Sequence, residues 1–320
     1  MQNRISFLLA LLLMSFAACQ MQDPMEPGAL VPLTVDEDGS LPAIDINDTR
    51  LHLRAFGEAT DPMLIFLHGG PGGDHKTFLP YQRLADEGYR VVMFDQRGAG
   101  RSRRHVGASF TEQQYLDDLE ALIVHFRQSA EQPVILIGHS WGAMYATMFI
   151  NTFPDQIQGA ILMEPGGLTD EQMMDYVSVA NRPKLFEEGS NDLVMADRII
   201  SPREHALADY RMFVSFSSVY EIDPNATPLP VWRMGAVAAR YTQSNTPDFD
   251  WTGNLEAFEP RVMLVYGGQS AGYTERHLQN VQSVYRDVEV IEIPESGHDL
   301  PFEAEADMLD LIRQYLNETL

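Results

Sequence analysis

The sequence predicts an α/β fold, with a mostly parallel central sheet, helices on both of its faces and a helical segment inserted late in the chain. Short apolar runs alternate with amphipathic stretches, as in a parallel sheet whose crossovers are helices. The runs at 63–67, 91–94 and 133–137 are apolar at every position, which is typical of strands buried on both faces. Glycine-bearing loops follow two of them, at 68–73 and 138–142.

Composition excludes several classes of protein. Of the 320 residues, 45% are hydrophobic and 21% are charged, which is ordinary globular usage and excludes wholesale disorder and fibrous repeats. Lys and Arg number 22 against 46 Asp and Glu, so the formal net charge is −24. Because such an excess repels phosphate backbones, we expect no nucleic-acid partner. One Cys excludes an intrachain disulfide and a cysteine-based zinc site.

Residues 1–18 predict an export signal of the lipoprotein type. Arg4 precedes an apolar run from Ile5 to Phe16, which is too short for a permanent transmembrane helix and suits a signal peptide. Cys19 follows two alanines, as in a bacterial lipobox, which this segment resembles; the alternative is an ordinary cleaved signal with an incidental Cys. We expect a tether at 19–29 and a place in the cell envelope, periplasmic or outer-membrane, with the membrane reached only through a lipid anchor on Cys19.

The first half of the folded part alternates strands and helices. Strands are expected at 33–35, 44–56, 63–67, 91–94 and 133–137. The turn-forming residues 36–40 separate the first two strands. Helices are expected over 78–87 and 111–128, and the second opens with a capping signal, Thr111 followed by Gln114.

The second half continues the alternation after one interruption. We expect helices at 141–153, 274–285 and 302–316, and strands at 159–163, 262–266 and 288–293. Between Gly166 and Asp250 the rhythm is broken by helical segments that carry Met and aromatic residues. We therefore divide the chain into a core at 30–166 and 251–320 and a cap at 167–250 that would close over the site.

The cap is rich in large apolar side chains. They could line a pocket for an apolar part of the substrate or form the cap's own core; they are Met173, Met174, Tyr176, Tyr210, Met212, Phe213, Phe216, Tyr220, Trp232 and Met234.

The first catalytic signal is the pattern Gly-x-Ser-x-Gly at 138–142, which directly follows an apolar strand and opens a helix. That context is typical of a nucleophile elbow. The sharp turn needs small neighbours and raises the Ser140 hydroxyl at a helix N-terminus, where developing negative charge is favoured. The alternative is a glycine-rich turn with a passive serine.

A serine nucleophile needs a base, and histidine is the usual one. We select His298 among the nine histidines because its loop follows strand 288–293 and opens at the same sheet edge as Ser140. We expect His139 to point into the fold and His68 to brace its glycine loop. The remaining six are expected at surface or packing positions: His52, His75, His105, His125, His205 and His277.

An imidazole base needs a carboxylate to fix its tautomer. The usual place, the turn after strand 262–266, reads Gly-Gly-Gln-Ser-Ala-Gly and holds no acid. Glu164 ends strand 159–163 at the same edge, and we predict that it orients His298. The alternatives are Glu275 or Asp299 in that role, or no orienting acid at all, with Glu164 capping a loop or pairing with an arginine.

Backbone N–H groups of Gly70 and Trp141 are the predicted oxyanion hole. Such donors each lower the barrier of acyl transfer by about 3 kcal/mol. The glycine loop is not a phosphate-binding P-loop, because His75 stands where that pattern needs Gly before Lys76-Thr77.

Three motifs together carry a family resemblance. His68-Gly69-Gly70-Pro71-Gly72-Gly73, Asp95-Gln96-Arg97-Gly98-Ala99-Gly100-Arg101-Ser102 and the Ser-Trp-Gly elbow stand in this order. Over about residues 30–320 the chain thereby resembles the α/β-hydrolase superfamily, and more narrowly its proline iminopeptidase-like branch. The resemblance implies the α/β-hydrolase fold and a serine nucleophile, with Asp95 and Arg97 shaping their loop. It also supports Glu164, since some relatives carry the acid after the earlier strand.

The resemblance also concerns the substrate. Aminopeptidases of this branch bind the substrate's free amine with acids in the cap, close to Trp-rich segments. The segment Val231-Trp232-Arg233-Met234 has no acid beside its tryptophan. The acids that the cap offers are Glu187, Glu188, Glu204 and Glu221.

We therefore expect a serine hydrolase that cleaves a carboxylic ester or an N-terminal aminoacyl bond through an acyl-enzyme. Its substrate would be a small molecule or short peptide with an apolar part, and no metal or organic cofactor is needed. Ser140 argues against epoxide hydrolases and dehalogenases, which share the fold but have Asp at the elbow. The alternatives are a proline iminopeptidase-type exopeptidase specifically, or a non-catalytic ligand-binding protein of the same fold.

Overall fold

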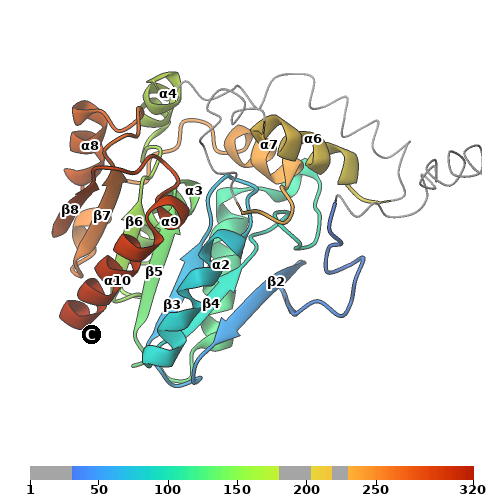
Figure 1. Ribbon diagram of the computed structural model, residues 1–320, viewed down its shortest axis with the longest axis horizontal. Helices are drawn as coiled ribbons and strands as arrows, with labels where there is room; N and C mark the ends of the chain where they lie inside the picture. The colour runs from blue at the N-terminus through green and yellow to red at the C-terminus, as the bar shows by residue number, and fades with distance from the viewer. Residues whose placement is uncertain (1–30, 180–202, 218–229) are drawn as a thin grey trace, which may run out of the picture.

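The structure is a computed structural model that describes residues 31–179, 203–217 and 230–320 (Figure 1). The predicted signal and tether, with Cys19, lie outside the described residues. So do the cap acids Glu187, Glu188 and Glu221, the aromatic residue Tyr220 and the side chain of Phe216. No helix in the described ranges is both long and apolar enough to cross a membrane.

Eight strands form one sheet in the order β1-β2-β4-β3-β5-β6-β7-β8. β1 and β2 pair in an antiparallel manner and β2 joins β4 in the same way, whereas all later pairs are parallel. The strands are β1 (Ala43–Ile46), β2 (Thr49–Phe56), β3 (Met63–Leu67), β4 (Arg90–Phe94), β5 (Val134–His139), β6 (Gly159–Met163), β7 (Val262–Gly267) and β8 (Val288–Ile293). The predicted mostly parallel sheet is confirmed.

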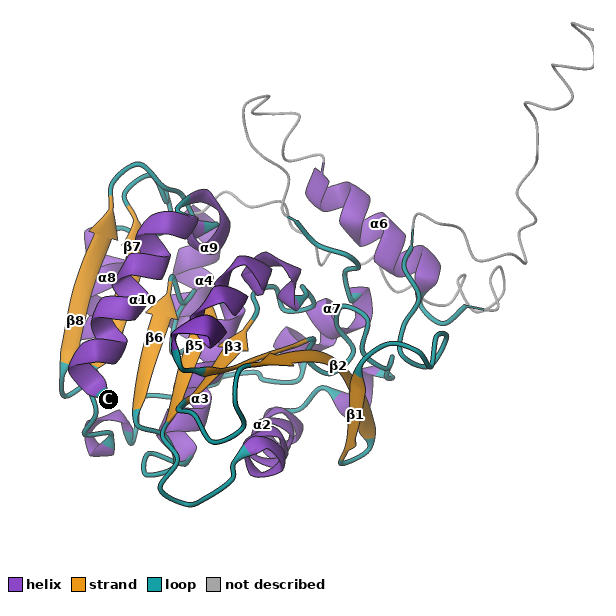
Figure 2. Cartoon of the chain, turned by 60° about the horizontal axis from the view of Figure 1, so that its bottom comes forward, coloured by secondary structure: helices purple, strands orange, loops and turns teal. Residues whose placement is uncertain are grey.

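Two separate apolar layers cover the faces of the sheet. Because successive side chains of a strand point to opposite faces, Leu64 and Phe66 of β3 enter one layer and Ile65 and Leu67 the other. The first layer is completed by η1 (His75–Glu87), α9 (Leu300–Glu303) and α10 (Glu305–Thr319), and the second by α2 (Glu112–Phe126), α3 (Trp141–Thr152) and α8 (Glu275–Gln282). Figure 2 shows α10 on one side of the sheet and α2 and α3 on the other.

Local structure differs from the sequence prediction at several places. The single helix expected over 302–316 is two helices, α9 and α10, that meet at Ala304. The strand expected at 33–35 is wrong: the segment forms turns, in which Thr34 N–H binds the Glu37 carboxylate. The strand expected over 44–56 is a hairpin, because Asn47 adopts φ 47° and reverses the chain. The helix expected over 78–87 is a 3₁₀ run that begins three residues earlier, with Asp74 accepting a cap bond from Lys76 N–H.

The insertion between β6 and β7 contains α4 (Asp170–Val179), α6 (Ala206–Ser217) and α7 (Ala236–Ser244). In Figure 1, α6 and α7 lie beyond the carboxyl ends of the central strands, and α4 lies near α8. The boundaries of the core and the cap stay predictions.

A buried cluster of charges joins the insertion to the core. Asp209 of α6 lies 2.9 Å from the guanidinium of Arg104, in the loop after β4, and 2.7 Å from that of Arg233. The other oxygen of Asp209 accepts the backbone N–H of Ala236, at the start of α7. All three charged side chains are buried. Asp209 brings one negative charge to the two guanidinium groups, and the Glu37 carboxylate, 2.9 Å from Arg233, brings a second.

Candidate active site

Ser140 sits in a strained turn between β5 and α3, with φ 53° and ψ −118°. Its backbone N–H donates to Met163 O of β6 at 2.8 Å, which holds the turn against the sheet. A Cβ at Gly142 would lie 1.9 Å from Leu67 O, and a Cβ at Gly138 would lie 2.3 Å from Gly142 O. Both glycines are therefore required by the close approach of α3 to the strands, and the helix N-terminus meets Ser140 as the sequence predicts.

A cavity of about 60 Å³ brings the candidate residues together. Ser140, Gly70 and His298 come from the ends of β5, β3 and β8, and all three line it. Its apolar side is formed by Val231 and Met234 of the insertion. The remaining lining residues are Gly69, Gly73, Asp74, Thr77, His139 and Asp299.

Glu164 lies directly against His298. Its Oε2 is 2.6 Å from His298 Nδ1, and its side chain is fully buried. The acid-free turn after β7 provides donors for the same carboxylate: Gly267 N–H binds Oε1 at 2.8 Å and the Ser270 hydroxyl binds Oε2 at 2.9 Å. The end of β6 thus supplies the acid and the end of β7 supplies its hydrogen bonds. Glu275, the first alternative acid, instead begins α8.

Two further side chains contact His298. His139 donates from Nε2 to the backbone oxygen of His298 at 2.7 Å, and the two rings lie 4.9 Å apart. The expectation that His139 only points into the fold is therefore incomplete, because its ring also lines the cavity. Tyr176 of α4 places its hydroxyl 2.9 Å from His298 Nδ1. In the sequence, Tyr176 stands out only as one of the large apolar side chains of the cap, with no sign of this contact.

The glycine loop is held by two side chains. His68 accepts Gln96 N–H at Nε2, 2.9 Å away, and donates from Nδ1 to Gly69 O at 2.9 Å. Burial lowers the pKa of His68 to about 4, so the ring is neutral, as this pair of bonds requires. The Gln96 side chain donates to His68 O and accepts the Trp141 indole N–H.

Through Gln96, these contacts connect the two segments that carry the predicted oxyanion donors, the backbone N–H groups of Gly70 and Trp141. Trp141 is the first residue of α3, where a backbone N–H has no intrahelical partner. Gly70, with φ 133°, holds a conformation that suits glycine, and an added Cβ would lie 2.5 Å from Gly72 N.

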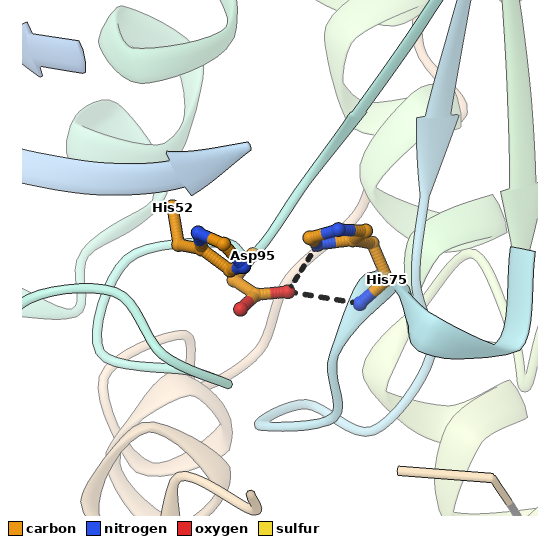
Figure 3. Close-up of side chains that lie close together, drawn as sticks. All are labelled: His52, His75 and Asp95. Atoms are coloured by element: carbon orange, nitrogen blue, oxygen red, sulfur yellow. Dashed lines mark hydrogen bonds and ion pairs between the residues drawn. The ribbon is translucent and has the colours of Figure 1, made fainter. Parts of the chain in front are cut away.

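Asp95 holds the start of η1 and its own loop after β4. One of its oxygens accepts both the backbone N–H and the Nδ1–H of His75 (Figure 3). Its other oxygen accepts Arg101 N–H. Burial opposes ionisation of Asp95, but the charge and hydrogen bond of His75 outweigh it and hold the pKa of Asp95 below its usual value. This agrees with the expected role of Asp95 in shaping its loop, and Arg97 does the same by pairing with Asp118 at 2.9 Å.

Two groups among the described residues have the ligand types of a metal site. His52, His75 and Asp95 offer ligand atoms within 4.8 Å of one another, and so do His139, His298 and Asp299. In the first group the Asp95 oxygens already accept three N–H donors, so its geometry is that of an ion pair within the loop. That no metal is needed stays a prediction.

Asp74 is an acid in the cavity that the sequence analysis missed. Its carboxylate accepts backbone N–H groups of Trp232 and Arg233 in the insertion, and of Lys76 on its own loop. The segment around Trp232 has no acid beside it in the sequence, but in the fold the Asp74 carboxylate lies against it. Burial, and then the charge of Asp95, raise the pKa of Asp74 to about 7. Its position directly after the glycine loop is the feature of the sequence that could have indicated a place in the cavity.

Known proteins agree with this architecture. Residues 64–311 match the model of the alpha/beta hydrolase family. The chain is 24% identical over 294 residues to proline iminopeptidase PfmaB of Pestalotiopsis fici, covering 86% of this chain and 99% of that protein. It is 36% identical over 116 residues to a proline iminopeptidase of Lactobacillus helveticus, and this match covers 35% of this chain and 38% of the relative.

Solved structures show the same fold. The proline iminopeptidase of Mycobacterium smegmatis aligns with a TM-score of 0.58 at 18% identity, over 88% of this chain and 98% of that one. A thermophilic esterase from Thermogutta terrifontis aligns with a TM-score of 0.60 at 21% identity, over 87% and 97%. The family match spans most of the chain, and the solved structures share its fold. The chain belongs to the alpha/beta hydrolase family.

Proposed function

We propose that the protein is a serine hydrolase that cleaves a carboxylic ester or an N-terminal aminoacyl bond through an acyl-enzyme. The observation that carries the proposal is the contact between Glu164 Oε2 and His298 Nδ1, 2.6 Å long, beside a cavity that also contains the strained Ser140. A carboxylate at Nδ1 leaves Nε2 of the imidazole as the free base, as serine catalysis requires.

The proposed reaction has two stages, acylation of Ser140 and hydrolysis of the acyl-enzyme. His298 Nε2 takes the Ser140 hydroxyl proton while Ser140 Oγ bonds to the substrate carbonyl carbon, and the oxyanion is bound by the N–H groups of Gly70 and Trp141. The imidazolium gives its proton to the leaving alcohol or amine, and the acyl-enzyme remains. In the second stage water gives a proton to His298 Nε2 while its oxygen bonds to the acyl carbon. The imidazolium then returns the proton to Ser140 Oγ as the acid is released. Glu164 stabilises the imidazolium in both stages.

The lining of the cavity supports a small, partly apolar acyl group. Val231 and Met234 offer apolar surface, and the lining also contains two acids, Asp74 and Asp299. Because the pKa of Asp74 is raised to about 7, a substrate with a carboxylate beside the scissile bond is disfavoured most above that pH, where Asp74 is ionised.

Labelling of Ser140 tests the mechanism. A fluorophosphonate probe should modify the wild-type protein and leave Ser140→Ala unmodified, and Ser140→Ala should lose all turnover. A fluorophosphonate that fails to label folded wild-type protein would support the non-catalytic ligand-binding alternative and overturn the proposal.

A proline iminopeptidase-type exopeptidase specifically is the second candidate function. It is favoured by the similarity to a protein named proline iminopeptidase over 86% of this chain. Short-chain p-nitrophenyl esters and aminoacyl p-nitroanilides, the prolyl compound included, should be compared by kcat/KM. Turnover of the prolyl anilide above the ester selects the exopeptidase, and the reverse selects the esterase.

We also propose export with a lipid anchor on Cys19 as the route to the cell envelope. The support is the apolar segment from Ile5 to Phe16 followed by the chain's one Cys. Metabolic labelling with a palmitate analogue should mark the wild type and not Cys19→Ala, which should leave the membrane fraction. An unlabelled wild-type protein found in the soluble fraction would contradict the anchor.

A further inference from the structure

The hydroxyl of Tyr176 shares the Nδ1 atom of His298 with the carboxylate of Glu164. Tyr176 Oη lies 2.9 Å from Nδ1 and Glu164 Oε2 lies 2.6 Å from it. The tyrosine belongs to α4, in the insertion, whereas the other two residues belong to the ends of β8 and β6. One ring nitrogen is thus contacted from two different segments, α4 and the end of β6.

The short distance to Glu164 decides where the proton lies. A carboxylate 2.6 Å from a bare imidazole nitrogen would set two lone pairs against each other, so Nδ1 carries the hydrogen and donates it. Tyr176 Oη then faces the same N–H and acts as a second acceptor, and its own hydroxyl proton points elsewhere. The result is a three-centre hydrogen bond from His298 to a carboxylate and a phenol.

The surroundings of Tyr176 are shaped to hold its ring. Tyr176 is buried, with its ring 5.0 Å from the ring of His277 and 6.3 Å from that of Tyr273. A Cβ on Gly272 would lie 2.3 Å from a ring carbon of Tyr176, so a glycine stands where the ring passes. On its other side Tyr176 lines a cavity of about 160 Å³ between α4 and α8, together with Gly272 and His277.

We propose that Tyr176 is a positioning residue for His298 and that it couples the orientation of the general base to the position of α4. The proposal rests on the proposed serine hydrolase function and adds a regulatory contact to that site. When Tyr176 is in place, the imidazolium formed during the reaction has two acceptors at Nδ1. Without the Tyr176 hydroxyl, Nδ1 loses one of these two acceptors and keeps Glu164.

This role predicts a change in the pH dependence of the reaction. A second acceptor stabilises the protonated imidazole, so removing it moves the acid limb of kcat/KM to lower pH, by about 0.5 pH unit. A looser imidazole also lowers kcat, by roughly fivefold, with little change in KM. A tyrosine that merely fills space would change stability and leave the acid limb where it is.

Tyr176→Phe is the direct test, because it keeps the ring and removes only Oη. Tyr273→Phe is the matched control: Tyr273 is an adjacent buried tyrosine whose hydroxyl donates to Pro165 O at 3.0 Å. Gly272→Ala is the second perturbation, since its methyl group would clash with the Tyr176 ring and displace it, while the tyrosine keeps its hydroxyl group. We expect the acid limb to shift in Tyr176→Phe and Gly272→Ala and not in Tyr273→Phe.

A readout that needs no turnover separates this proposal from the proposed function. The Nδ1 proton of His298 should give a downfield ¹H NMR signal in ¹⁵N-His-labelled protein, assigned by its loss in His298→Gln. That signal should move in Tyr176→Phe and stay in Tyr273→Phe. An unmoved signal together with an unmoved acid limb in Tyr176→Phe overturns the positioning role. If the fluorophosphonate does not label the wild-type protein, the hydrolase function is overturned instead. The NMR signal still shows in that case whether Tyr176 Oη contacts His298 Nδ1.

Discussion

Glu164 and His298 are 134 residues apart in sequence, and their side chains meet at 2.6 Å. The end of β7 and the turn after it contribute Gly267 N–H and the Ser270 hydroxyl to the same carboxylate. The carboxylate at His298 Nδ1 therefore comes from the end of β6, and the neighbouring parallel strand β7 supplies its hydrogen-bond donors.

Glu164→Gln should reduce kcat by about 10³- to 10⁴-fold, because a neutral amide can donate to Nδ1 and select the wrong tautomer. Steady-state kinetics on the better of the ester and anilide substrates would measure this. Glu275→Gln is the matched control and should retain turnover. Near-wild-type kcat in Glu164→Gln would assign the orienting role to another acid, with Asp299→Asn the next variant to measure.

Gln96→Leu should lower kcat by roughly tenfold and change KM little, because Gln96 joins the glycine loop at His68 O to the Trp141 indole. Both ends of that link belong to the segments that carry the proposed oxyanion donors. The measurement is kcat and KM, with far-UV circular dichroism to establish that the variant is folded. Gln113→Leu, on the exposed side of α2, should behave as wild type; equal kcat in both variants would argue against a role for this link.

Asp209→Asn should destabilise the fold by about 3 kcal/mol, because it removes the carboxylate that pairs with the buried guanidinium of Arg104 and leaves Arg233 with Glu37 as its remaining ion-pair partner. Urea unfolding would measure the change in the free energy of unfolding. Asp310→Asn removes one exposed partner of Arg313 and should cost less than about 1 kcal/mol. Equal losses in the two variants would show that the buried cluster adds nothing to stability.

Asp74 should make the free energy of unfolding depend on pH. Its pKa is raised from 3.8 to about 7 in the folded protein, so between these values the folded state holds a proton that the unfolded state lacks. The contribution of Asp74 is therefore greatest at low pH and is lost as pH rises through about 7. Urea unfolding at a series of pH values from 5 to 8 should show this loss in the wild type and a flatter profile in Asp74→Asn.

The control for that profile is Asp86→Asn, at an exposed position of η1. It should keep the wild-type slope. A slope that survives in Asp74→Asn would mean that another group, and not Asp74, takes up the proton on folding.

The strands, the elbow and the order of the motifs were predictable because their signals are local. Runs of apolar residues predict strands buried on both faces, and the glycines at 138 and 142, which the close approach of α3 to the strands requires, are visible in the sequence. The hairpin at Asn47 and the turns at 33–35 were not predicted, since short apolar stretches there do not distinguish a strand from a packed turn.

The class of fold, the candidate nucleophile Ser140 and the sheet edge that carries the base and the acid can all be inferred from the amino-acid sequence. The contact of Glu164 with His298, the place of Tyr176 at the same nitrogen and that of Asp74 beside the tryptophan segment are seen in three dimensions. A strand or a tight turn is specified by neighbours in the chain, whereas a contact of 2.6 Å between residues 134 positions apart depends on how every intervening element packs.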